Sequence, residues 1–324
     1  MKHPTLKKKE LTFREIEKIF KSIGHLYFFN ISGGEPFLRK DLVKIVELAC
    51  KYLTPKIIHT PTNALMPEVI EKETKKIMEI IKKNKLKTVF TIKPSFDGIG
   101  AKHDEIRGVK GNFKKVLETL KRLKKLQKDY PNLDVGLGTV ISKFNVKEIK
   151  EIVDYAKKLS VDSYINEIGE QRSELFNTDM DITPSADDYE KAIKYFSAKI
   201  KQGFKTNKKL TKSTKAFRLV YYDLVSKILR KKKQVILCYA GLTNAHINPY
   251  GEVWPCCILG YKKPMGDLRK VNYDFKKVWY SKRADEVRNY IQNGKCYCPL
   301  ANQAYSNILC NFKSMLEVLR NMLF

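Results

Sequence analysis

Residues 25–37 read HLYFFNISGGEPF, an apolar run followed by two glycines, a glutamate and a proline. The apolar run has the length of a buried strand. Gly33 and Gly34 allow a tight turn or a close approach of the backbone to a ligand. Glu35, fixed between the glycines and Pro36, is then held at a defined angle beside the turn. This stretch predicts a strand that ends at a ligand-binding loop.

Strand and helix alternate on the C-terminal side of this stretch. Further strands are expected near 56–60, 88–93, 133–141 and 161–168, and helices over 41–52, 67–83, 112–128, 145–159, 186–201 and 216–231. Such alternation predicts a parallel sheet of about five strands joined by right-handed crossovers. Ligands of such sheets bind at the carboxyl ends of the strands. The series opens on a helix, with a capping box at Thr12 and Glu15, and no strand precedes it.

Polar side chains follow the next two strands. Asn63 ends the loop after the strand near 56–60, and Ser95 follows the strand near 88–93. Arg107 lies a little further on and carries a planar fork of donors that suits a carboxylate. Taken alone, Arg107 is also explained by a surface ion pair with Asp104 or Glu105.

Together these loops closely resemble the radical S-adenosylmethionine (SAM) superfamily over residues 11–168. The resemblance implies an α/β fold, a partial (βα)6 TIM-like barrel whose first strand is missing from this series. It implies that the segment Gly33, Gly34, Glu35 and Pro36 lines the amino end of the methionine moiety of SAM. It also implies that Ser95 and Arg107 hold the SAM carboxylate, and that Asn63 borders the SAM pocket.

One family feature is absent, because no cysteine precedes Cys50. The family's Cys-x3-Cys-x2-Cys motif binds the [4Fe–4S] cluster that cleaves SAM, and it follows the first strand. The missing motif and the missing strand are one gap, so we expect a start codon placed too late, rather than a truncated gene or a loss of radical chemistry. The radical SAM cluster is therefore expected only if cysteines are encoded upstream.

Six of the seven cysteines lie between Cys238 and Cys310, a grouping that favours a metal site over disulfides. Residues 247–254 read as a hairpin, which would bring together the cysteines on either side of it. This segment resembles the SPASM/twitch extension of radical SAM enzymes, which implies an auxiliary [4Fe–4S] cluster. The implied ligands are Cys238, Cys256, Cys296 and Cys298, with Cys257 and Cys310 as alternatives. Four thiolates also suit zinc. Cys50 is expected to be a buried apolar side chain in a helix.

The length allows one large unit and one small one, and the composition changes near residue 234, so we expect a large unit over 1–234 and a small cysteine-rich domain over 235–324. The resemblance implies that the large unit is the partial barrel. The net charge is +28, but the lysines are spread over almost every helix, which disfavours nucleic acid as a partner. No apolar run is long enough to span a bilayer, and residues 1–10 lack the features of a signal peptide. We therefore expect a cytoplasmic protein that does not bind membranes.

The sequence as a whole predicts a radical SAM/SPASM-type protein. When full length, it is expected to be an enzyme that modifies a peptide, a protein or a small metabolite and that needs an electron donor. No catalytic residue is assigned. One alternative is an inactive remnant or scaffold without the radical SAM cluster, and another is a basic nucleic-acid-binding zinc protein.

Overall fold

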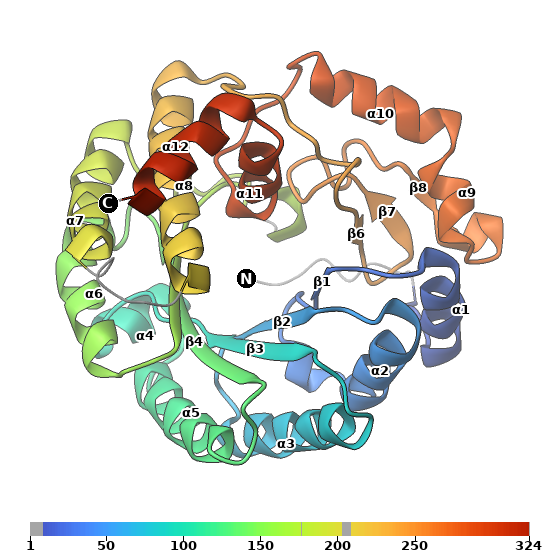
Figure 1. Cartoon of the computed structure of the whole chain (residues 1–324), viewed down its shortest axis with the longest axis horizontal. Coiled ribbons are helices and arrows are strands. Elements are labelled where there is room, and N and C mark those ends of the chain that lie inside the picture. The colour runs from blue at the N-terminus through green and yellow to red at the C-terminus, as the bar shows by residue number, and fades with distance from the viewer. Residues whose placement is uncertain (1–8, 176, 203–208, 324) are drawn as a thin grey trace.

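The computed structural model describes residues 9–175, 177–202 and 209–323. Five strands form one parallel sheet in chain order, which curls into a half-barrel (Figure 1). They are β1 (Phe28–Asn30), β2 (Ile57–Thr62), β3 (Val89–Pro94), β4 (Leu133–Ile141) and β5 (Ser163–Ile168). The predicted partial barrel is thereby confirmed. In the described part of the chain β1 pairs with β2 alone, and its Phe28 is 51% exposed.

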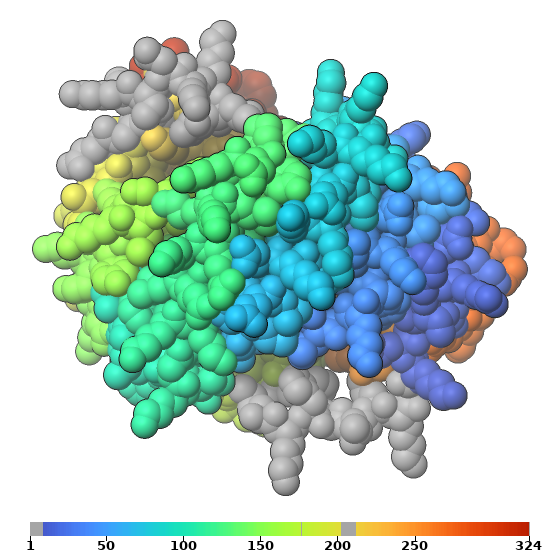
Figure 2. Space-filling view, turned by 90° about the horizontal axis from the view of Figure 1, so that it is seen from below, coloured from blue at the N-terminus to red at the C-terminus, as the bar shows by residue number. Residues whose placement is uncertain are grey.

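Helices cover the outer face of this sheet, and they form the convex surface coloured from blue through green to yellow in Figure 2. They are α2 (Leu42–Leu48), which continues as a π-helical turn η2 (Ala49–Leu53), α3 (Pro67–Lys83), α4 (Ala101–Arg107), α5 (Asn112–Gln127), α6 (Ile149–Lys158), α7 (Ala186–Gln202) and α8 (Lys209–Lys231). No described helix combines the length and the apolar character that a membrane crossing requires. Cys50 is 5% exposed within the core of the barrel, as predicted.

Helix caps show where local sequence rules succeed and fail. The capping box at Thr12 and Glu15 heads α1 (Phe13–Ile23) as predicted. Asp41 and Asn145 stand at N-cap positions and Asn112 is the first residue of its helix, but none of the three side chains forms a cap hydrogen bond. Asp41 accepts from the Arg39 guanidinium, Asn112 donates to the Asn63 carbonyl, and Asn145 accepts from the Ser142 amide.

The C-terminal part contains a small antiparallel sheet of β6 (His246–Ile247), β7 (Glu252–Trp254) and β8 (Gly266–Asp267). The predicted hairpin between β6 and β7 is confirmed, and Asn248 Oδ1 fixes its turn by accepting from the amides of Tyr250 and Glu252. Gly251 has φ +91°, a conformation that side chains disfavour. Four helices follow: α9 (Phe275–Trp279), α10 (Lys282–Gln292), α11 (Ala301–Leu309) and α12 (Phe312–Leu323).

Two hydrophobic cores tie this part to the barrel. The larger core lies between the sheet and its helices, and it includes Ile308 of α11 and Val318 of α12, which pack with α8. The second core joins Phe20 of α1 to Val253 of β7 and Leu268. Because the C-terminal part is packed against both ends of the barrel, its cysteines are held in a defined place beside the sheet.

Candidate cofactor sites

Glu35 is fixed at the carboxyl end of β1 before any ligand binds. Its carboxylate accepts from the Asn63 amide at 2.6 Å, from the Thr62 hydroxyl at 3.0 Å and from the Phe37 amide at 3.2 Å. Gly33, two residues before Glu35, has φ +141°, and a Cβ at this position would meet no atom within 4 Å, so the backbone at this turn is accessible. A carboxylate held in this way suits the binding of an ammonium group.

The surroundings of Glu35 act in opposite directions on its pKa. Burial raises the pKa of Glu35, whereas the hydrogen bonds from Asn63, Phe37 and Thr62 lower it. The nearby charge of Arg107 also lowers this pKa, so Arg107 lies within electrostatic range of Glu35. The first and third of the predicted loops therefore approach one another in the folded chain.

Asn63 and Ser95 link these two loops. Asn63 Oδ1 accepts from the Leu65 amide at 3.0 Å, which shapes the loop after β2. The Ser95 amide donates to the Thr62 carbonyl at 2.9 Å, and this places Ser95 at the adjacent strand end. Because this backbone bond joins the carboxyl ends of β2 and β3, the loops that carry Asn63 and Ser95 are neighbours. Thr62, which sequence reasoning did not single out, connects both loops to Glu35.

Arg107 pairs with a buried partner rather than a surface one. Its Nη1 donates to Asp97 Oδ2 at 3.1 Å, and the Asp97 side chain is 4% exposed. Asp97 is itself held, because its Oδ1 accepts from the Val140 amide at 2.7 Å. The alternative of a surface ion pair with Asp104 or Glu105 is wrong for this structure. Asp104 instead accepts from the amides of Gly111 and Phe113 at the start of α5.

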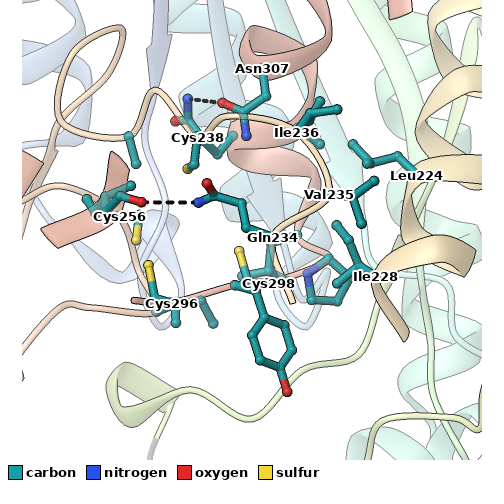
Figure 3. Close-up of a pocket in the computed structure, with 18 of the residues that line it drawn as sticks. Leu224, Ile228, Gln234, Val235, Ile236, Cys238, Cys256, Cys296, Cys298 and Asn307 are labelled. Atoms are coloured by element: carbon teal, nitrogen blue, oxygen red, sulfur yellow. Dashed lines mark hydrogen bonds between the residues drawn. The ribbon is translucent and has the colours of Figure 1, made fainter. Parts of the chain in front are cut away.

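The four cysteines predicted as ligands line one pocket between the barrel and the C-terminal helices (Figure 3). Their sulfur atoms come from the segment before β6, the turn after β7 and the segment before α11, and they face the same space. The remaining walls are mainly apolar, with side chains such as Leu224, Ile236 and Leu300. The hairpin and the Cys-x-Cys segment thus bring together four thiols that are distant in sequence.

The protein matrix disfavours free thiolates in this pocket. Burial raises the pKa of Cys256 to about 12 and that of Cys296 to about 11, and it also raises the pKa of Cys298. The neighbouring thiol of Cys238 adds to all three shifts, which shows that the four groups interact. A bound metal centre would reverse this preference, because it stabilises the thiolate directly.

The two alternative cysteines lie outside the pocket lining. Cys257 is buried and receives a contact from Asn302 Nδ2 at 3.9 Å, whereas Cys310 is exposed at the end of α11. In the described part of the chain, no three histidine, cysteine, aspartate or glutamate side chains are close enough together to hold a single metal ion.

Comparison with protein families gives two matches. Residues 2–156 match the radical SAM superfamily, and residues 238–299 match the SPASM iron–sulfur cluster-binding domain. The first range contains the Glu35 and Arg107 loops, and the second contains all four cysteines of the pocket. The matches support SAM and iron–sulfur clusters as cofactors, in agreement with the sequence-based prediction.

Curated relatives differ in what they make. The antilisterial bacteriocin subtilosin biosynthesis protein AlbA of Bacillus subtilis is 23% identical over 301 residues, which cover 86% of this chain and 58% of that protein. The AdoMet-dependent heme synthase of Methanosarcina barkeri is 25% identical over 264 residues, covering 77% of this chain and 67% of that protein. The chain therefore spans about three-fifths to two-thirds of the length of these relatives.

Solved structures of anSMEcpe share the fold. The structure with bound AdoMet gives a TM-score of 0.56 at 16% identity and covers 97% of this chain and 88% of that one. The structure with AdoMet and the Kp18Cys peptide gives a TM-score of 0.55 at 17% identity, covering 97% and 89%. At this level of identity the likeness establishes the common architecture.

Proposed function

Because the chain is a radical SAM protein with a SPASM-type iron–sulfur domain, we propose that it binds SAM and modifies a peptide or a small molecule. The observation that carries this proposal is the meeting of the Glu35, Asn63, Ser95 and Arg107 loops at the carboxyl ends of β1 to β3. The radical chemistry would be supplied by SAM together with a [4Fe–4S] cluster held by a Cys-x3-Cys-x2-Cys motif, which residues 1–324 do not contain. The residues of this chain would bind and orient SAM and the substrate.

The proposed roles of the SAM-site residues follow from their charges. Glu35 accepts from the ammonium group of SAM, and the backbone at Gly33 and Gly34 borders the same group. Arg107 binds the SAM carboxylate through its planar donor fork, with Ser95 as a second donor. Asp97 holds the Arg107 side chain at the proposed SAM site while no ligand is bound.

The proposed ligands of the auxiliary [4Fe–4S] cluster are the four pocket cysteines. They line the same pocket, they influence one another electrostatically, and the pocket walls are mainly apolar, which suits a buried cluster held by four thiolates. All seven cysteines are unpaired, which fits a reducing compartment, and on this basis we place the protein in the cytoplasm. A cluster of this kind needs an electron donor as a partner.

A peptide is the favoured substrate class within this proposal. AlbA takes part in the biosynthesis of a bacteriocin, and one anSMEcpe structure holds a peptide. The heme synthase similarity leaves a small-molecule substrate as the second option. The two options differ in the groups that the binding site must recognise, because a peptide presents a chain of main-chain amides.

The proposed function is tested by purifying the chain without oxygen and measuring iron, zinc and SAM binding together. We expect about four irons per chain after reconstitution, as one [4Fe–4S] cluster requires, and saturable SAM binding by calorimetry. Zinc in place of iron, or no measurable SAM binding, would contradict the proposal. In a longer chain that supplies the Cys-x3-Cys-x2-Cys motif, SAM binding without formation of 5′-deoxyadenosine under reducing conditions would favour a binding scaffold over an enzyme.

A further inference from the structure

Buried polar atoms without hydrogen-bond partners gather around the loop after β5. Among the described residues nine buried side-chain nitrogen and oxygen atoms have no partner. Five of the nine belong to the set that we call the η4–α11 cluster: Arg172 Nε, Ser173 Oγ, Glu174 Oε2, Asn244 Oδ1 and Gln303 Oε1. Unpaired buried polar atoms are costly and rare in native folds, so a local concentration of them indicates that a ligand supplies their partners.

These atoms come from three segments that meet in space. Gln303 Nε2 on α11 donates to Thr243 Oγ1 at 3.1 Å, next to Asn244 in the chain. Asn302, also on α11, contacts the Cys257 thiol. The Arg172 side chain is within hydrogen-bonding reach of the same thiol, so Arg172 lies beside Cys257. In Figure 1 the lime-coloured turn η4 (Ser173–Leu175) accordingly lies next to α11.

The cluster has the right position to face a substrate. The Arg172 to Glu174 segment follows β5 directly, so it lies at the carboxyl edge of the sheet, the edge that carries the Glu35 and Arg107 loops. Gln303, which is 3% exposed, also borders the cysteine pocket. A ligand held by this cluster would therefore lie between the proposed SAM site and the proposed iron–sulfur centre.

The unpaired atoms select the chemistry of the ligand. Three of them, on Glu174, Asn244 and Gln303, are acceptors, while Arg172 Nε is a donor and the Ser173 hydroxyl can act as either. A phosphate or carboxylate ligand presents acceptors and would leave those three atoms unpaired. A chain of amides offers N–H donors and C=O acceptors in alternation. We infer that the η4–α11 cluster binds the main chain of a peptide substrate, an inference that rests on the proposed function.

An unpaired group that waits for a ligand has a distinctive mutational signature. Its removal takes no hydrogen bond from the free protein but removes one from the complex. Ser173→Ala and Asn244→Leu should therefore leave the melting temperature of the free protein unchanged or raise it. Each should weaken peptide binding by about three- to tenfold, the contribution of a single neutral hydrogen bond.

Thr74 on α3 provides a matched control. Its buried hydroxyl is also unpaired, but it lies on a helix outside the cluster. Thr74→Val should behave like the cluster variants in thermal unfolding and like the wild type in peptide binding.

The probe is a mixed library of end-blocked heptapeptides, compared with the same library methylated on every amide nitrogen. Retention by the immobilised full chain should fall for the methylated library, and retention of the unmethylated library should fall for both cluster variants. The inference would be overturned by equal retention of both libraries or by unchanged retention on the variants. It would also be overturned if both variants had a lowered melting temperature, which is expected if ordered water already pairs these atoms. SAM binding is measured on the same samples. If SAM binds but the peptide results contradict the inference, the inference fails while the SAM-binding part of the proposed function stands.

Discussion

The loops of the proposed SAM site and the cysteine pocket differ in how they are prepared for the ligands proposed for them. Glu35 and Arg107 are already held by polar partners, Asn63 and Thr62 for the carboxylate and Asp97 for the guanidinium. The four thiols of the pocket are instead surrounded by apolar side chains, and burial holds three of them in the protonated form. The first site is organised without its ligand, whereas the second depends on its occupant for the charge state that binding requires.

The largest expected effect is at the pocket. Replacing any one of the four pocket cysteines should reduce the iron content from about four per chain to a small fraction of that value, because a [4Fe–4S] cluster needs four thiolates. The variants are Cys238→Ala, Cys256→Ala, Cys296→Ala and Cys298→Ala. Iron analysis and the visible absorbance of reconstituted protein measure this. Cys50→Ala, in the barrel core, and Cys310→Ala, at the surface, are the controls and should retain the iron. Retention of the cluster by any of the four variants would remove that residue from the ligand set.

A smaller effect is expected at the organised site. Arg107→Ala should weaken SAM binding by about 1.5–3 kcal/mol, or roughly 10- to 150-fold, because a charge-assisted contact to the carboxylate is lost. Calorimetric titration with SAM measures the change. Lys102→Ala, which breaks only an exposed pair with Glu105 on the same helix, should bind SAM as the wild type does. Equal affinities for all three proteins would return Arg107 to a purely structural role with Asp97.

The charge of Glu35 gives the SAM site a pH dependence. Glu35 must be ionised to attract an ammonium group, and burial raises its pKa above the ordinary glutamate value of 4.5. SAM affinity should therefore fall as the pH decreases through this raised pKa. Glu35→Gln should bind SAM more weakly at neutral pH and should lose this pH dependence. A wild-type affinity that stays constant from about pH 7 to about pH 4, a range that spans the glutamate titration, would show that the Glu35 charge does not contact SAM.

The smallest effect concerns the junction of the two regions. Glu15 of α1 accepts from Tyr273 in the C-terminal part, and this bond is the main cause that lowers the pKa of Glu15 from 4.5 to about 2. A lowered pKa stabilises the folded state above about pH 4.5, and this contribution is lost as the pH falls toward about 2. Urea midpoints of the wild type and Glu15→Gln should thus differ at about pH 7 and converge near pH 2. A difference that is constant with pH would refute this assignment.

Periodicity and strand-end motifs were sufficient to predict the parallel sheet, the hairpin and the loops of Glu35, Asn63, Ser95 and Arg107. The closing of the sheet into a partial barrel was implied by the family resemblance. The roles of these four residues, like the ligand roles of the four cysteines, stay predictions. The sequence alone could not identify hydrogen-bond and ion-pair partners that the fold brings together. Asp97 stands ten residues before Arg107, while Asp104 and Glu105 are closer in sequence, so the alternative ion pair was sought with the wrong residues. Thr62 and the η4–α11 cluster likewise depend on contacts that only the packed chain defines.

The core that joins α1 to the C-terminal part has a consequence for synthesis. Phe20 packs with Val253 and Leu268, so the two sides of this core are separated by more than two hundred residues of chain. Translation at about 5–20 residues per second delays the second side by roughly ten seconds or more. During that interval the apolar face of α1 has no partner from the C-terminal part. We therefore expect the nascent chain to be aggregation-prone until its last third has emerged from the ribosome.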